Sequence, residues 1–400
     1  MKGSRHTQRN TIAHTRFRTF RTLSAAMIVL AMFLSGCSGR NEVVIDVAGQ
    51  DYEFETEPVA RPDGEPFRIA FMDLGPPIES SYLCLKGFVE GLQTLGYINE
   101  SIDFSEAPAE FFAYYDFVLS HDLGKYVSFD DEPYMIGVGD DERIKETLVS
   151  ESESGALDIV VGTGTDPGIF LKELDLEIPF LICLATDPVA SGIIDSAEDT
   201  GDDDIWALVE PNPYKRQFEG YQKMLGFDRI AMMTVNGMDT ITGNPLYREK
   251  AGELGVKIDE INFSEEESLE EDYYDQMYES LKNADLSEDD AILFAYGTMD
   301  DASAPELSGY AAEKGIPSLI GDGDSISEMG GMMCLSCFDY EGYGNYASMV
   351  ASNVFHGQKA GKQPCIYTSS PHVVLNMTTA KNTGFVTGFD LLRGVDRIYR

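Results

Sequence analysis

The chain has 400 residues, of which 43% are hydrophobic, so it is long enough for two domains with cores and too apolar for global disorder. Its formal net charge is -40, from 29 Lys and Arg residues against 69 Asp and Glu residues. Such a surface argues against nucleic acid or an anionic membrane as a partner, because like charges repel. It says little about a small ligand, because most of these carboxylates are expected to be solvated.

The N-terminus has the pattern of an export signal. Basic residues precede the apolar run 24–34, which is too short to cross a bilayer. The run ends in LSGC at 34–37, which resembles a bacterial lipobox. We therefore expect a lipoprotein signal peptide at 1–36 and acylation, for example by palmitate, at Cys37. The alternative is an ordinary signal peptide with an incidental cysteine.

Residues 37–65 are polar, acidic and interrupted by proline, which predicts a lipid-anchored linker with one short strand at 43–47. Order is expected to begin at Arg68. From there, apolar runs alternate with amphipathic helical patterns, as in βαβ units with parallel sheets. The segment 105–150 is long, aromatic and acidic, and it fits this alternation poorly.

The predicted strands fall into two sets, separated near Trp206. They are 68–74, 157–164 and 178–185 in the first set, and 229–235, 291–297 and 316–322 in the second. These runs lack polar and apolar alternation, which indicates strands covered by helices on both faces of a sheet. Two α/β lobes are the simplest fold that accounts for the pattern.

Each predicted strand is followed by a loop rich in Gly, Ser, Thr, Asn or Asp. Ligands of open parallel sheets bind beyond the carboxyl ends of the strands, where such loops converge. Ser and Thr hydroxyls and helix-start N–H groups can hold a carboxylate, and Asp can hold an amine. Turn chemistry alone explains any single loop, but the repetition favours a site.

The candidate ligand-binding residues come from both sets of loops. They are Tyr82, Thr163, Thr165, Asp166, Thr186 and Asp187 in the first set, and Asn236, Tyr296, Thr298, Asp300 and Asp322 in the second. The two tyrosines are expected to stack on a ring of the ligand.

Four segments together resemble the ABC-transporter substrate-binding lipoproteins, which include tryptophan- and tyrosine-binding proteins. They are GFVEGLQTLGY (87–97), LDIVVGTGT (157–165), EIPFLICLATDPVASGII (177–194) and the C-terminal stretch 347–385. The resemblance spans roughly 68–385. It departs from the family at 105–150, which is longer here, and at 196–206, where SAEDTGDDDIW replaces a Gly-Gly-Asn-x-Thr-Gly element.

This resemblance implies a type I periplasmic-binding fold, with two Rossmann-like lobes whose parallel sheets are joined by three crossovers. The first lobe would comprise 66–195 plus 338–361, and the second 196–337 plus 362–400. A small solute would bind between the lobes and be enclosed by hinge closure.

The expected function is therefore an extracytoplasmic solute-binding lipoprotein of an ABC importer. Its ligand would be an amino acid or another aromatic or carboxylated molecule. Its partners would be an ABC permease and, through the lipid, the periplasmic or outer face of the cell membrane, and the protein would be a monomer. The alternative is a lipid-anchored sensor that uses the same cleft to signal to a membrane receptor.

An enzyme is not expected, and neither is a cofactor or a metal. The sequence has no Gly-x-Ser-x-Gly elbow, HExxH motif or Walker loop, and no GxGxxG after the first strand. Asp322 and Asp324 begin like a calcium loop, but Ile326 and Ser327 occupy positions that require an oxygen ligand and a glycine. The CxxC at 334–337 has no second CxxC or His pair with which to bind zinc.

Overall fold

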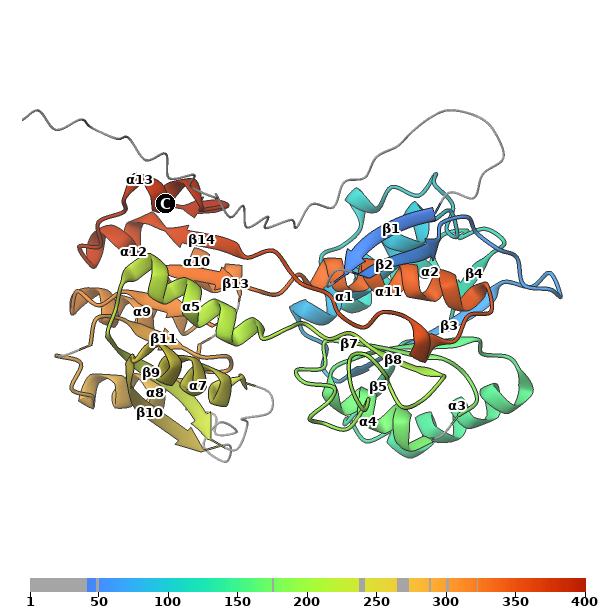
Figure 1. The fold of residues 1–400 in the computed structure, drawn as a ribbon, viewed down its shortest axis with the longest axis horizontal. Helices are drawn as coiled ribbons and strands as arrows, with labels where there is room; N and C mark the ends of the chain where they lie inside the picture. The colour runs from blue at the N-terminus through green and yellow to red at the C-terminus, as the bar shows by residue number, and fades with distance from the viewer. Residues whose placement is uncertain are drawn as a thin grey trace, which may run out of the picture. The chain divides into compact units, whose positions relative to one another are not determined.

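The computed structural model describes residues 42–47, 50–174, 176–236, 242–264, 273–287, 289–299, 302–321 and 323–400 (Figure 1). The expected signal peptide and the expected lipidation site at Cys37 lie outside the described residues. Within these ranges, no helix has both the length and the apolarity needed to cross a membrane.

The first sheet has the strand order β4-β3-β6-β7-β8, with β5 also paired to β3, and all of its pairings are parallel. Its strands are β3 (Phe67–Leu74), β4 (Val127–Phe129), β5 (Tyr134–Ile136), β6 (Ile159–Thr163), β7 (Phe180–Cys183) and β8 (Ile205–Ala207). The segment 105–150 thus contributes two short strands, β4 and β5, to the edge of this sheet beside β3.

Helices cover both faces of the first sheet, which explains why its strands are apolar throughout. The helices are α1 (Glu79–Thr94), α2 (Phe111–Leu119), α3 (Asp141–Ser154), α4 (Thr165–Leu174) and α11 (Tyr340–Phe355), with the short 3-10 turn η1 (Phe104–Glu106). In β3, Ile69 and Phe71 pack under α1, α2 and α11, whereas Ala70 and Met72 pack toward α3 and α4.

Order begins earlier than the expected Arg68. Strands β1 (Glu42–Val47) and β2 (Gln50–Glu55) form an antiparallel hairpin. Phe54 is 1% exposed, and its ring lies 5.7 Å from that of Tyr346 on α11. The Ser352 hydroxyl also donates to the carbonyl oxygen of Glu55 (2.6 Å). The strand expected at 43–47 is present as β1, whereas β2 was not predicted, because one buried aromatic in a polar segment has no periodicity.

The second sheet has the order β10-β9-β11-β12-β13-β14-β15, and it is parallel except where β14 meets β13. Its strands are β9 (Arg229–Asn236), β10 (Lys257–Ser264), β11 (Ile292–Phe294), β12 (Ser318–Ile320), β13 (Met333–Ser336), β14 (His372–Asn376) and β15 (Arg397–Tyr399).

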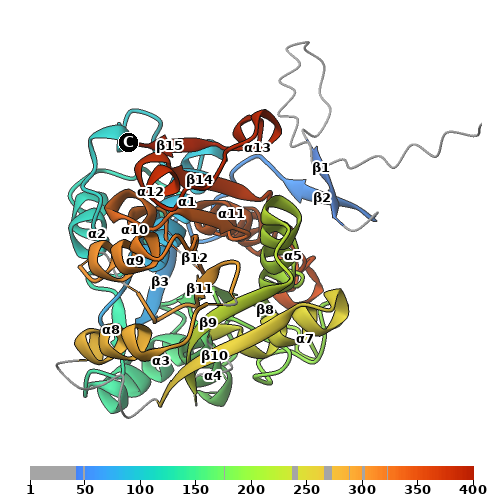
Figure 2. The same cartoon turned by 90° about the vertical axis from the view of Figure 1, so that its left-hand side faces the viewer.

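The second sheet is also covered on both faces (Figure 2). Its helices are α5 (Pro213–Leu225), α7 (Asn244–Leu254), α8 (Tyr273–Asn283), α9 (Ala304–Glu313), α10 (Asp324–Met329), α12 (Met377–Asn382) and α13 (Phe389–Arg393). Met232 of β9 packs with α5 and α7 on one face, whereas Met233 packs with α8 and α9 on the other. The two lobes are therefore built by the same layering.

The chain passes between the two sheets three times, at 208–212, 337–339 and 363–371. The first and third crossovers pair, since the Val209 N–H donates to the carbonyl oxygen of Cys365 (2.8 Å) and the Tyr367 N–H donates to that of Val209 (3.0 Å). The second crossover leads into α11, which returns to pack among the elements of the first sheet (Figure 1).

The first crossover comes later than the sequence analysis places it. Strand β8 pairs with β7, with Trp206 opposite Leu181, so the first sheet extends beyond residue 195. Trp206 is fully buried, and its indole N–H donates to the carbonyl oxygen of Pro364 (2.8 Å). A three-residue strand after a run of aspartates is too short to be assigned from its own pattern.

Candidate functional site

The carboxyl ends of β3, β6 and β7 place Asp73, Thr163 and Cys183 side by side in register. The loops that follow β6 and β7 are also joined to each other. The Gly164 N–H donates to the carbonyl oxygen of Cys183 (2.8 Å), and the Thr186 N–H donates to the Thr165 hydroxyl oxygen (3.4 Å). Two of the sequence-predicted loops therefore form one surface at this edge of the sheet.

This surface carries hydroxyl groups, amide donors and carboxylates. Thr165 and Thr186 are half-buried, whereas Asp166 and Asp187 are exposed. Thr165 and Asp166 lie in the first turn of α4, where unpaired N–H groups and the helix dipole favour an anion. The Asp187 carboxylate accepts from the N–H groups of Val189 (3.2 Å) and Ala190 (2.8 Å). The surface can therefore hold both a carboxylate and an amine.

Thr163 and Thr298 have a different role from the expected one. The Thr163 hydroxyl donates to the carbonyl oxygen of Met72 (3.1 Å), and the Thr298 hydroxyl donates to that of Ala295 (2.6 Å). Both side chains are fully buried. Each hydroxyl uses its proton inside the fold, so these residues support the loops. A sequence pattern cannot separate the two roles, because both need a threonine at a strand end.

The remaining predicted residues are partly described. Tyr82 is half-buried on α1, its ring lies 5.6 Å from that of Tyr114, and burial raises the pKa of its hydroxyl. Tyr296 is half-buried just after β11. Asp300 and Asp322 lie outside the described residues, as does the side chain of Asn236, whose backbone ends β9.

Asp73, the penultimate residue of β3, was not among the site residues predicted from the sequence. The carboxylate is 4% exposed; its Oδ1 accepts the Leu74 N–H (2.7 Å), and its Oδ2 is buried without a hydrogen-bond partner among the described residues. Burial raises the pKa of Asp73 to about 6, although the hydrogen bond from the Leu74 N–H acts in the opposite direction. An acid that directly ends an apolar strand is the signal that could have identified it.

Backbone strain is present at one position of the candidate site and at one position of the first crossover. Among the residues that the structure describes, Leu184 (φ 60°) and Asn212 (φ 48°) are the non-glycine residues with positive φ. A leucine in this region is costly because its Cβ crowds the backbone. Leu184 directly follows β7 at the candidate site, and Asn212 lies in the first crossover. Such strain concentrates where surrounding contacts hold a functional conformation.

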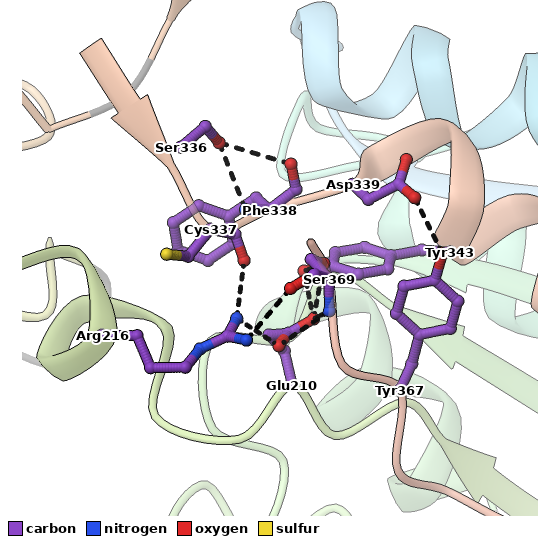
Figure 3. Close-up of polar contacts among 9 residues, drawn as sticks. All are labelled: Glu210, Arg216, Ser336, Cys337, Phe338, Asp339, Tyr343, Tyr367 and Ser369. Carbon is purple, nitrogen blue, oxygen red and sulfur yellow. Dashed lines mark hydrogen bonds and ion pairs between the residues drawn. The ribbon is translucent and has the colours of Figure 1, made fainter. Parts of the chain in front are cut away.

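The crossovers carry a buried polar cluster, here called the hinge cluster, of Glu210, Arg216, Tyr343 and Ser369 (Figure 3). The Arg216 guanidinium contacts the Glu210 carboxylate at 2.6 Å. The hydroxyls of Ser369 (2.6 Å) and Tyr343 (3.1 Å) donate to the other carboxylate oxygen. Burial raises the pKa of Glu210, and these partners act against that rise. None of these residues was predicted from the sequence, although the family resemblance implied a hinge.

The described residues contain neither a metal-binding cluster nor a disulfide. No group of three His, Cys, Asp or Glu side chains is placed there to hold a metal ion. The thiols of Cys84, Cys183, Cys334, Cys337 and Cys365 are all buried, and none is part of a disulfide.

Two α/β lobes with mainly parallel sheets, joined by three crossovers and carrying polar loops at their strand ends, define a type I periplasmic-binding fold. The ABC transporter substrate binding protein family matches residues 141–395, which is more than half of the chain. The chain belongs to this family, as its resemblance indicated. A search of curated protein sequences returned no match.

Solved structures share the fold at low sequence identity. A conserved domain protein from Vibrio cholerae is 18% identical, with a TM-score of 0.60 over 84% of this chain and 100% of that one. An ABC domain in complex with L-Trp from Streptococcus pneumoniae is 16% identical, with a TM-score of 0.59 over 84% of this chain and 100% of that one. A ligand-free, open substrate binding protein with adhesive properties from Clostridium difficile is 16% identical, with a TM-score of 0.63 over 83% of this chain and 99% of that one.

Proposed function

We propose that the protein is the extracytoplasmic solute-binding component of an ABC importer, and that a small solute binds between its lobes and is enclosed by hinge closure. The observation that carries this proposal is the joined surface of the loops after β6 and β7, held by the contact between Thr165 and Thr186. This surface lies at the carboxyl ends of parallel strands, where such sheets bind ligands.

The proposed solute is an amino acid or another small aromatic or carboxylated molecule. Thr165, Thr186 and the first N–H groups of α4 would hold its carboxylate, and Asp166 and Asp187 would hold an amine. The rings of Tyr82 and Tyr296 would cover an apolar part of the solute. Asn236, Asp300 and Asp322 remain proposed contacts from the second lobe. The L-Trp complex of the streptococcal neighbour supports this class of ligand.

The proposal extends to the cell surface. Removal of residues 1–36 would leave Cys37 as an acylated first residue, which would tether a monomeric receptor to the outer face of the cell membrane beside its permease. Mass spectrometry of the mature N-terminus tests this part. An unmodified N-terminus at another position would contradict it.

A thermal-shift and calorimetric screen of amino acids, nucleosides and short peptides tests solute binding. A bound solute stabilises the folded state by mass action, so one chemical class should raise the melting temperature. Thr165→Ala should weaken the affinity for that solute about tenfold in calorimetry, because a hydrogen bond to a charged group is lost. Thr94→Ala removes an exposed hydroxyl that bonds only the helix backbone, and it serves as the matched control. Absence of stabilisation by every solute would contradict the proposal.

A further inference from the structure

We propose that Glu210 is the positioning residue of the hinge, whose carboxylate sets the equilibrium between the arrangement of the lobes seen here and other arrangements. This inference rests on the proposed function, because closure around a solute is part of that function. The inference extends that function by assigning the control of closure to one buried carboxylate.

The two oxygens of the Glu210 carboxylate are bonded to different parts of the molecule. Oε1 faces the Arg216 guanidinium of α5 at 2.6 Å and also accepts from the Ser369 N–H at 3.2 Å. Oε2 accepts from the Tyr343 hydroxyl of α11 (3.1 Å) and from both the hydroxyl (2.6 Å) and the N–H (2.9 Å) of Ser369. The Glu210 side chain is only 7% exposed, so water offers it little alternative. The carboxylate therefore depends on this set of donors.

Arg216 extends the contact to the other crossovers. Its guanidinium donates to the carbonyl oxygens of Cys337 (3.2 Å) and Ser369 (3.0 Å), which belong to the second and third crossovers. Because Glu210 itself lies in the first crossover, the pair of Glu210 and Arg216 is bonded to all three (Figure 3). In the part of the chain that the structure describes, these three crossovers are the segments at which the backbone passes from one lobe to the other.

The partners of Glu210 belong to opposite lobes. Tyr343 is buried in the core of the first lobe, whereas α5, which carries Arg216, packs on the second sheet. Rotation of one lobe about the crossovers changes the separation of Tyr343 and Arg216, so the carboxylate cannot keep both partners at their present distances. The cluster therefore stabilises one arrangement relative to others.

The backbone next to Glu210 cannot absorb this change easily. Pro211 and Pro213 fix their own φ angles, and Asn212 between them is held at φ 48°, in the left-handed region. A strained residue persists only where its surroundings determine its conformation. The Asn212 carbonyl oxygen accepts from the N–H of Arg216 (3.0 Å), the residue that pairs with Glu210, so the conformation of the crossover is coupled to the hinge cluster.

Solute-free single-molecule energy transfer on the full chain tests the inference. Dyes on Glu153→Cys of α3 and Glu253→Cys of α7, in a Cys37→Ser background, would report the lobe separation, since both positions are exposed and the other five cysteines are buried. Glu210→Gln keeps the shape of the side chain and removes its charge. We expect it to lower the population of the wild-type separation relative to others by about tenfold, because charge-assisted hydrogen bonds are lost.

Glu219→Gln is the matched control, because Glu219 lies on α5 and pairs with Lys223 and Lys250 away from the crossovers. Its distribution should equal that of the wild type. Should Glu210→Gln fail to fold, Tyr343→Phe and Ser369→Ala each remove one hydroxyl bond to the Glu210 carboxylate and leave the ion pair, and each should shift the distribution in the same direction. The inference would be overturned if a folded Glu210→Gln chain had the wild-type distribution. It would also be overturned if neither Tyr343→Phe nor Ser369→Ala shifted the distribution. The measurement needs no solute, so a failure of the proposed binding function would leave its result intact.

Discussion

A Cβ atom built on Gly87 of α1 would lie 1.9 Å from the carbonyl oxygen of Glu341 on α11. The relationship is reciprocal, because a Cβ on Gly344 of α11 would lie 2.0 Å from the carbonyl oxygen of Cys84 on α1. Two helices that are far apart in the sequence thus meet backbone to backbone. This contact attaches the returning helix to the first lobe, and with it the second crossover.

Gly344→Ala should therefore destabilise the protein strongly. The added methyl group has backbone as its neighbour, so the helices have to separate, and we expect the free energy of unfolding to fall by about 3 kcal/mol or more. Gly252→Ala in α7 is the control, because a Cβ there meets no atom within 4 Å. That change should stabilise by about 0.5–1 kcal/mol through helix propensity. Urea denaturation measures both, and equal effects would disprove the close contact.

Adjacent tyrosines on α2 should respond in opposite ways to loss of the hydroxyl. The Tyr114 hydroxyl is buried without a hydrogen-bond partner in the described structure, whereas the Tyr115 hydroxyl donates to the carbonyl oxygen of Asp130 (2.9 Å). We expect Tyr114→Phe to raise the free energy of unfolding by about 1 kcal/mol and Tyr115→Phe to lower it by a similar amount. Thermal melts of the two variants decide the matter, and a destabilised Tyr114→Phe would reveal a partner for that hydroxyl.

Asp73 should make stability depend on pH. Its pKa in the folded state is raised to about 6 from an ordinary value of 3.8, so the folded state binds more protons than the unfolded state between these values. The contribution of this group to the free energy of unfolding should therefore fall by about 3 kcal/mol as pH rises from about 3 to about 7, with about 2 kcal/mol of that loss between about pH 4 and pH 6. Asp73→Asn should lack this component. Parallel pH profiles of variant and wild type in urea titrations would contradict the assignment.

Two substitutions of Asp187 should separate its structural role from its proposed role in ligand binding. Its carboxylate accepts from the N–H groups of Val189 and Ala190, so Asp187→Ala should cost about 1 kcal/mol of stability, as the loss of a cap does. Asp187→Asn keeps an oxygen acceptor, and it should retain the stability while losing the charge that would hold a solute's amine. Melting temperatures with and without solute measure both effects. If Asp187→Asn binds an amine-bearing solute as the wild type does, the proposed amine contact is wrong.

Much of the architecture could be predicted because it is encoded locally. The runs that became β3, β6 and β7 are almost wholly apolar, and each leads into a polar loop. The fold class and family were confirmed on that basis. The roles of Thr163 and Thr298 could not be predicted, because a threonine at a strand end looks the same whether its hydroxyl faces a solute or a carbonyl oxygen inside the protein.

The sequence by itself determined which segments are buried strands and which helix faces are apolar, since these depend on the periodicity of neighbouring residues. It also located the polar loops that follow the strands. Only the tertiary structure decided that Phe54 and Trp206 belong to the first lobe, that α11 packs against α1, and that Glu210 meets Ser369. Each of those contacts joins residues far apart in the chain, so its energy depends on the packed arrangement and leaves no periodic trace in either segment.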